Sequence, residues 1–266
     1  MAVAAAGNQL GLELERQISE LEGNEGGMRD GGSEALHRFR VATRRSRALL
    51  RPCSGVDELQ RELRWLADVL GPVRDLDVLI EHVQELVEEL ADDRAGGEAI
   101  VAALEAQRSD ARAELMAALD SERYKELLRR FRNDIALLGE TDHDHLVSLA
   151  ARELKRLQQA YTALGPRAPD DELHRVRIKA KRTRYAAELA GKPLAKLADA
   201  AKRLQDAIGT HQDAVVAEQR VRGVAKGASL LAAGRIVERE RERRREARAG
   251  LPKVWKRLER AAAKAF

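Results

Sequence analysis

Two short segments concentrate the residues best suited to binding an anion. LHRFRVATRRSR at 36–47 and LHRVRIKAKRTR at 173–184 each open with Leu-His and contain no acid. The first, extended to Arg51, holds six arginines, and the second holds six bases. Removing these 12 from the 48 Lys and Arg leaves 36 bases against 44 acids, a balance of −8 for the rest of the chain. Positive charge is therefore localised, which favours a localised anionic partner.

On a helix, the bases of each segment form one narrow row that spans about 80° of arc. The first basic row consists of His37, Arg40, Arg44, Arg47 and Arg51. The second basic row consists of His174, Arg177, Lys181 and Arg184. Apolar residues border both rows on both sides, whereas a solvated basic face normally lies opposite the apolar stripe. The rows are therefore expected to line a groove or pore rather than an open surface.

Like charges in such a place must face carboxylates, water or an external anion. Asp75 and Asp213 are expected in the first turn of a helix, where a carboxylate suits the N-terminus and can also orient arginines. Two acids cannot neutralise nine bases. The first row is roughly 21 Å long at 1.5 Å per residue, and arginine suits phosphoryl oxygens. This predicts a long, linear phosphate polymer, inorganic polyphosphate, as the partner.

Two other functions stay open, an RNA-binding or scaffold protein and a metal-dependent hydrolase of the same polymer. Nucleic acid is disfavoured because single-strand binders need stacking aromatics, and the chain has three Phe, three Tyr and two Trp. The hydrolase lacks a recognisable metal cluster. His143, Asp144 and His145 are interpreted as the polar start of a helix rather than as metal ligands. No metal, no cofactor and no catalysis are expected.

The elements that position these residues are expected to be α-helices. Composition is rich in Ala, Leu, Glu and Arg, and all six prolines are placed between helices. The predicted helices are 9–22, 33–50, 57–70, 73–91, 98–119, 121–138, 142–164, 171–190, 194–208, 211–224, 228–249 and 252–265. The glycine-rich segment 23–32 is predicted as a loop. A single cysteine, Cys53, and the absence of a signal peptide or a spanning apolar run indicate a cytoplasmic protein away from membranes.

The chain also repeats itself. A shift of 137 residues aligns the two basic segments, and a shift of 138 aligns LADVLGPVRDLDV (66–78) with LQDAIGTHQDAVV (204–216). This predicts an all-α tandem duplication, with one helical bundle at about 1–139 and another at about 140–266. Two antiparallel bundles related by a pseudo-two-fold axis around a basic groove or pore are the simplest arrangement, in a monomer with internal pseudo-dimer symmetry. Phe39, Tyr185, Trp65 and Trp255 are expected in the core.

At these motifs the sequence resembles the CHAD family, the conserved histidine α-helical domain. The matching segments are LHRFRVATRRSRALL, LHRVRIKAKRTRYAAEL, LGPVRDLDVL, IGTHQDAVV and LDSERYKELL. The resemblance implies a single domain over 1–266 made of two bundles, which binds inorganic polyphosphate without catalysis, often at polyphosphate granules. It assigns binding roles to His37, Arg40, Arg44, Arg45, Arg47, His174, Arg177, Lys181, Arg182 and Arg184. No segment of these 266 residues resembles the CYTH hydrolase domain often fused to such modules, so the simplest reason to expect hydrolysis is missing.

One position departs from the repeat. Glu188 stands where the first half has Arg51. The second basic row is therefore predicted to be shorter or to carry an internal salt bridge.

Overall fold

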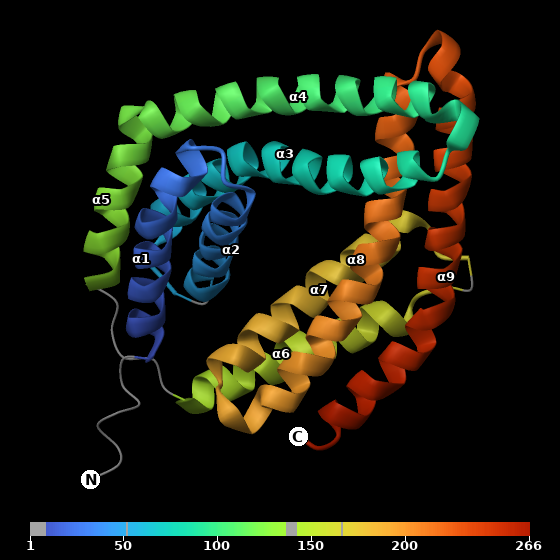
Figure 1. Cartoon of the computed structure of the whole chain (residues 1–266). Coiled ribbons are helices and arrows are strands. Elements are labelled where there is room, and N and C mark those ends of the chain that lie inside the picture. Colours follow the sequence, from blue (N-terminus) through green and yellow to red (C-terminus); the bar gives the residue numbers. More distant parts are fainter. Residues whose placement is uncertain (1–8, 52, 137–142, 166) are drawn as a thin grey trace. The chain divides into compact units, whose positions relative to one another are not determined.

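The computed structural model describes residues 9–51, 53–136, 143–165 and 167–266, and all regular structure in these ranges is helical (Figure 1). The all-α prediction is confirmed. The helices are α1 (Gln9–Arg29), α2 (Ser33–Leu50), α3 (Asp57–Glu88), α4 (Arg94–Asp120), α5 (Glu122–Ala136), α6 (His143–Thr162), α7 (Asp170–Leu189), α8 (Ala195–Val224) and α9 (Leu230–Ala262). Short 3₁₀ turns are η1 (Ala91–Asp93), η2 (Lys192–Leu194) and η3 (Gly227–Ser229).

Some predictions fall on positions outside these ranges. They are the prolines Pro52 and Pro166, and the boundary between repeats at 139–140. Within the ranges that are described, no helix combines the length and the apolar character needed to cross a membrane.

The chain divides into two compact units. The first draws on Met1–Thr141 and Lys226–Ala232, and the second on Asp142–Ala225 and Ala233–Phe266. In the first, α1 packs on α2, α2 on α3, and α3 along α4, while α5 contacts α1 and α3 (Figure 1). In the second, α7 packs against both α6 and α8. The pseudo-two-fold relation between the repeats stays a prediction.

Each basic segment is held in place by the buried side chains of its own helix. On α2 the buried residues are Leu36, Phe39, Ala42, Thr43, Ser46, Leu49 and Leu50. On α7 they are Leu173, Val176, Ala180, Thr183, Tyr185, Ala186, Ala187 and Leu189. Two of the predicted core aromatics, Phe39 and Tyr185, are among them. Burial of these faces against neighbouring helices fixes the rotation of α2 and α7, and with it the direction of the bases.

The other two predicted core aromatics differ from each other. Trp255 of α9 is buried and stacks on Tyr161 of α6, with ring centroids 3.8 Å apart. Trp65 of α3 is only half-buried, and the Arg123 guanidinium covers it at 4.2 Å from the ring centroid. Trp65 therefore lies at the edge of the core.

Three predicted breaks between helices are wrong. α3 continues through Pro72, α8 through Gly209 and α9 through Pro252. A proline inside a helix costs about 3 kcal/mol because it removes a hydrogen bond. Both prolines are exposed, however, and buried apolar side chains such as Leu70 and Val73 continue on either side. Tertiary packing of the apolar face outweighs the local preference.

The glycine-rich segment 23–32 is helical over most of its length, contrary to the predicted loop. A Cβ at Gly27 would lie 3.1 Å from the Ala35 Cβ, so glycine permits close approach of α1 to α2. The helix ends where Gly31 adopts a φ of 97°, in the left-handed region. Arg112 of α4 then donates to two carbonyls in the last turn of α1, at 3.2 and 2.7 Å. The glycines serve packing and helix termination.

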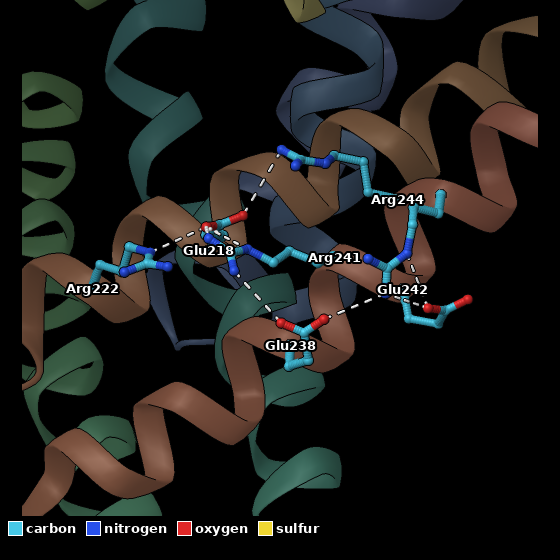
Figure 2. Close-up of polar contacts among 7 residues, drawn as sticks. Glu218, Arg222, Glu238, Arg241, Glu242 and Arg244 are labelled. Atoms are coloured by element: carbon cyan, nitrogen blue, oxygen red, sulfur yellow. Dashed lines mark hydrogen bonds and ion pairs between the residues drawn. The ribbon is translucent and has the colours of Figure 1, made fainter.

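The charged segment 237–248 lies in α9 and forms ion pairs within the helix, as its alternating charges suggest. It is also tied to α8, because Glu218 of α8 accepts contacts from Arg222, Arg241 and Arg244 (Figure 2). Glu240 is buried, with 1% of its surface exposed. One face of this segment is therefore fixed against the rest of the second unit.

Candidate anion-binding site

The first basic row lies on α2, whose neighbours are α1 and α3. Its first four members are half-buried, and Arg51 is exposed at the end of the helix. The Arg44 Nε is buried and has no hydrogen-bond partner in the described part of the chain. Arg40 Nη2 donates to Asp75 Oδ1 of α3 at 2.9 Å. The row thus presents charged donors that the protein satisfies only in part.

The prediction that the two repeated acids, Asp75 and Asp213, lie in the first turn of a helix is wrong. Asp75 and Asp213 lie in the middle of α3 and α8, because neither helix breaks at the expected place. Asp75 instead holds Arg40 by an ion pair. For this residue, the role of orienting an arginine is the one that the geometry supports.

Residues of α3 surround the first row with further charge. Partial burial lowers the pKa of His37, and the neighbouring Arg74 lowers it further, while Glu34 opposes this shift. Burial likewise lowers the pKa of Arg47, with a further contribution from Arg64. Sequence analysis missed both α3 arginines because the supposed break at Pro72 concealed the continuous face on which they lie.

Arg45 occupies a different place from the row. Its Nε lies 3.3 Å from Glu13 Oε1 of α1. On the helix it is about 80° from His37, on the side away from Arg40. Its binding role, implied by the family resemblance, stays a prediction.

The second basic row lies on α7, whose neighbours are α6 and α8. His174 is exposed, and Arg177, Lys181 and Arg184 are half-buried, as is Arg182 beside the row. The Arg177 Nε is buried and finds no hydrogen-bond partner within the described ranges, and a Cβ at Gly209 would lie 3.4 Å from it. The lack of a side chain at Gly209 therefore leaves room for this guanidinium against α8.

The charges within the second row affect its histidine. Partial burial lowers the pKa of His174, and so do Arg177 and Lys181, while Asp171 opposes the shift. His174 thus shares with His37 the combination of desolvation and nearby cations. Both imidazoles favour the neutral form in the free protein.

The predicted internal salt bridge of the second row is confirmed. Arg184 Nε donates to Glu188 Oε1 at 2.7 Å, and Arg184 Nη1 donates to Gln205 Oε1 at 3.4 Å. The guanidinium of Arg184, the last cation of this row, therefore already contacts Glu188 of its own helix and Gln205 of α8.

No group of three or more His, Cys, Asp or Glu side chains that could hold a metal ion occurs among the residues the structure describes. Asp144 and His145 lie in the first turn of α6, which begins at His143. The prediction that His143, Asp144 and His145 lie at the start of a helix is confirmed.

Comparison with known proteins places these features in a family. The CHAD domain matches residues 13–222. Two curated relatives are "Uncharacterized protein Rv2226" of Mycobacterium tuberculosis (strain ATCC 25618 / H37Rv) and "Uncharacterized protein MT2285" of strain CDC 1551 / Oshkosh. Each is 28% identical over 275 residues, covering 95% of this chain and 53% of the relative. The chain therefore spans about half the length of these relatives.

Two solved structures share the fold. "PptA from Streptomyces chartreusis" has a TM-score of 0.77 at 21% identity, covering 94% of this chain and 99% of that one. The CHAD domain from the plant Ricinus communis has a TM-score of 0.69 at 24% identity, covering 98% and 92%. The matched residues 13–222 include both basic rows and the helices that carry them. The chain belongs to the CHAD domain family.

Proposed function

We propose that this chain binds inorganic polyphosphate, without catalysis, through the first and second basic rows. The observation that carries the proposal is that one buried Nε atom in each row, in Arg44 and in Arg177, has no hydrogen-bond partner among the described residues. A buried donor left unsatisfied costs about 1–3 kcal/mol, and more when it is charged. An anion that enters each row supplies the missing acceptors and offsets this cost.

The spacing of the bases favours a polymer over a compact anion. Each row presents a cation at nearly every turn, about every 5.4 Å along the helix. A linear chain of phosphate units can meet such cations in succession, whereas a small metabolite meets one or two. Guanidinium groups bind phosphoryl oxygens through paired hydrogen bonds. Membership of the CHAD family supports the same partner, because the family resemblance implies polyphosphate binding.

Two rows on one chain make binding dependent on polymer length. A polymer that occupies both rows binds the second one at a raised effective concentration. Long chains are therefore expected to bind more tightly than short chains at equal phosphate concentration. Calorimetric titration with polyphosphates of graded length measures this directly.

The decisive experiment compares two double variants in that titration. Arg44→Ala with Lys181→Ala removes one central cation from each row, and about 100-fold weaker binding is expected from two lost charged contacts. Arg257→Ala with Arg260→Ala removes the same charge from exposed positions near the end of α9. This control is expected to stay within about twofold of the parent protein. Equal losses in both variants, or no binding at low salt, would contradict the proposal.

Two further measurements on the same protein test the alternative functions, a hydrolase and a nucleic-acid-binding protein. Release of phosphate from the polymer with added Mg²⁺ or Mn²⁺ would indicate a hydrolase. RNA that displaces bound polyphosphate at equal charge concentration would indicate a nucleic-acid-binding protein. A fluorescent fusion is expected to gather on polyphosphate granules in the cytoplasm, and to lose that pattern in the Arg44→Ala, Lys181→Ala variant.

A further inference from the structure

A second cluster of bases, outside both basic rows, surrounds a pocket of about 250 Å³ within the second unit. We call it the His211 pocket. Its walls come from the first residue of α7, the middle of α8 and the charged segment of α9. The lining residues are Asp170, His211, Arg244, Arg245 and Arg248.

His211 is the most unusual residue of this pocket. Its side chain is fully buried, with 0% exposed, and neither ring nitrogen has a hydrogen-bond partner among the residues that the structure describes. Nε2 lies 3.3 Å from Asp170 Oδ1 without forming a hydrogen bond. Buried polar groups are satisfied in nearly all proteins, so an orphaned imidazole in the wall of a pocket points to a ligand. A neutral imidazole offers that ligand one N–H donor.

The arginines of α9 make the pocket cationic. Arg244 Nη1 lies 3.7 Å from Asp170 Oδ2, too far for a hydrogen bond. It lies 3.8 Å from Glu218 Oε2, which is also too far (Figure 2). Arg248 donates a hydrogen bond to the carbonyl of Ala168, which lies just before the first residue of α7. Three guanidinium groups against one carboxylate give the lining a formal charge of +2 with His211 neutral. The pocket therefore suits an anion.

The acids around the pocket do not cancel this charge completely. Arg245 is held by Glu238 and Glu242 of α9, yet 61% of its side chain is exposed. Glu218 is shared among three arginines. The ion pairs of Arg245 are weak because both partners are exposed, so a ligand with two charges competes with them effectively.

The donors match the end of a phosphate chain better than its interior. A terminal phosphoryl group carries three free oxygens and up to two negative charges, whereas an internal unit has two free oxygens and one charge. Asp170 precedes His174 by one helical turn and lies on the same face of α7. The pocket therefore continues the line of the second basic row beyond its N-terminal end.

We propose that the His211 pocket binds a terminal phosphoryl group, supplied by free orthophosphate or by the end of a polyphosphate chain. The polymer source rests on the proposed function, and the orthophosphate source does not. The group accepts hydrogen bonds from His211 and from Arg244, which now face Asp170. Asp170 acts as an internal competitor, and its carboxylate turns toward solvent when the phosphoryl group enters.

The test follows the imidazole of His211 by NMR, assigned with the His211→Gln variant, during titration with three probes. Orthophosphate and linear tripolyphosphate both have terminal groups, whereas cyclic trimetaphosphate has the same three phosphates as tripolyphosphate and no end. A shift of the His211 resonances by either linear probe, but not by trimetaphosphate, is expected. A response to tripolyphosphate alone identifies the chain end as the source. No response to either linear probe, or an equal response to trimetaphosphate, would overturn the proposal.

Two substitutions with opposite expected effects on the affinity for the linear probes strengthen the test. Arg245→Gln, at an exposed position that folding tolerates, is expected to weaken binding of the linear probes about tenfold. Asp170→Asn is expected to strengthen it severalfold, which a purely structural role for Asp170 would not do. Arg257→Gln, an exposed arginine of α9 outside the pocket, is the matched control and should change nothing. Weaker binding in Asp170→Asn, or equal losses in Arg245→Gln and Arg257→Gln, would contradict the assignment.

Long-chain polyphosphate distinguishes this proposal from the function on which it partly rests. If the long polymer binds normally while His211 stays silent with all probes, the pocket assignment fails and the basic rows stand. If His211 responds to the linear probes while Arg44→Ala with Lys181→Ala leaves the affinity for the long polymer unchanged, the function of the rows fails and the pocket stands.

Discussion

Arg184 and Glu188 form an ion pair within one turn of α7, with Nε and Oε1 2.7 Å apart. Both side chains are largely shielded, with 19% and 26% exposed. In the first half of the chain the position equivalent to Glu188 is Arg51, which ends α2 as an exposed cation. The two basic rows therefore do not offer an anion the same charge, because the second row has a carboxylate at the position where the first row has a further cation.

Replacement of Glu188 by Gln should release Arg184 for an external anion. We expect polyphosphate to bind severalfold more tightly, with a steeper dependence on salt because one more cation participates. Isothermal titration at several salt concentrations measures both quantities. Glu105→Gln, which neutralises an exposed acid of α4, is the matched control. If the two variants gain equally, net charge rather than release of Arg184 governs the affinity.

The stability of the free protein should fall in mild acid. Burial lowers the pKa of His37, His174 and His211 in the folded state, while the unfolded chain titrates near the ordinary value of about 6.5. Between these pKa values the unfolded state binds more protons, so folding stability is complete above about pH 6.5 and is lost as the pH falls below it. Urea unfolding from about pH 8 to 5.5 should show this decrease. His211→Gln should reduce it, whereas an unchanged profile in that variant would exclude His211 as a source.

Protonation of the histidines in the two rows should strengthen polyphosphate binding, whereas it lowers the stability of the free protein. A polyanion beside His37 and His174 raises their pKa, so binding is accompanied by proton uptake. The affinity is expected to rise as the pH falls from about 7.5 to 6. Calorimetry in two buffers of different ionisation enthalpy counts the protons taken up. A pH-independent affinity with no proton uptake would show that the imidazoles do not contact the polymer.

The sequence predicted the placement of the bases well because their pattern is local. Residues such as Arg44 and Lys181 lie on a helical row wherever the helix forms, and the apolar borders identify which side packs. On α2 and α7 the members of the two rows are half-buried, except Arg51 and His174, which are exposed. The salt bridge between Arg184 and Glu188 could also be predicted from the sequence, because the two residues lie four apart on one helix.

The sequence failed where tertiary packing overrides local signals. Pro72 and Gly209 indicated breaks, yet α3 and α8 continue because their buried faces do. Those false breaks hid Arg74 beside His37 and placed Asp75 at a helix start. The His211 pocket was inaccessible for another reason, since it joins three helices that are distant in sequence. Only the fold brings Asp170 to His211 and the arginines of α9.

The core behind the first row should dominate the stability of its unit. Phe39 is fully buried, with 0% exposed, and Phe39→Ala should cost about 3–5 kcal/mol of unfolding free energy. Tyr124→Phe removes only the hydrogen bond to Glu25 Oε2 at 2.8 Å and should cost about 1 kcal/mol. Urea denaturation measures both values. Because neither side chain belongs to a basic row, the folded fraction of each variant should bind polyphosphate as the parent protein does.

The ion pair between Arg40 and Asp75 provides the sharpest test of competition between internal acids and the ligand. The pair is 2.9 Å long, and 62% of the Asp75 side chain is exposed, so Asp75→Asn should cost less than about 1 kcal/mol of stability. The Asp75→Asn substitution should nevertheless tighten polyphosphate binding, because Arg40 then no longer has to give up its ion pair with a carboxylate before it binds a phosphate. Asp92→Asn, in an exposed turn, is the control for net charge. In an Arg40→Ala background the gain from Asp75→Asn should disappear, and a gain of the same size there would show that the two residues act on the polymer independently.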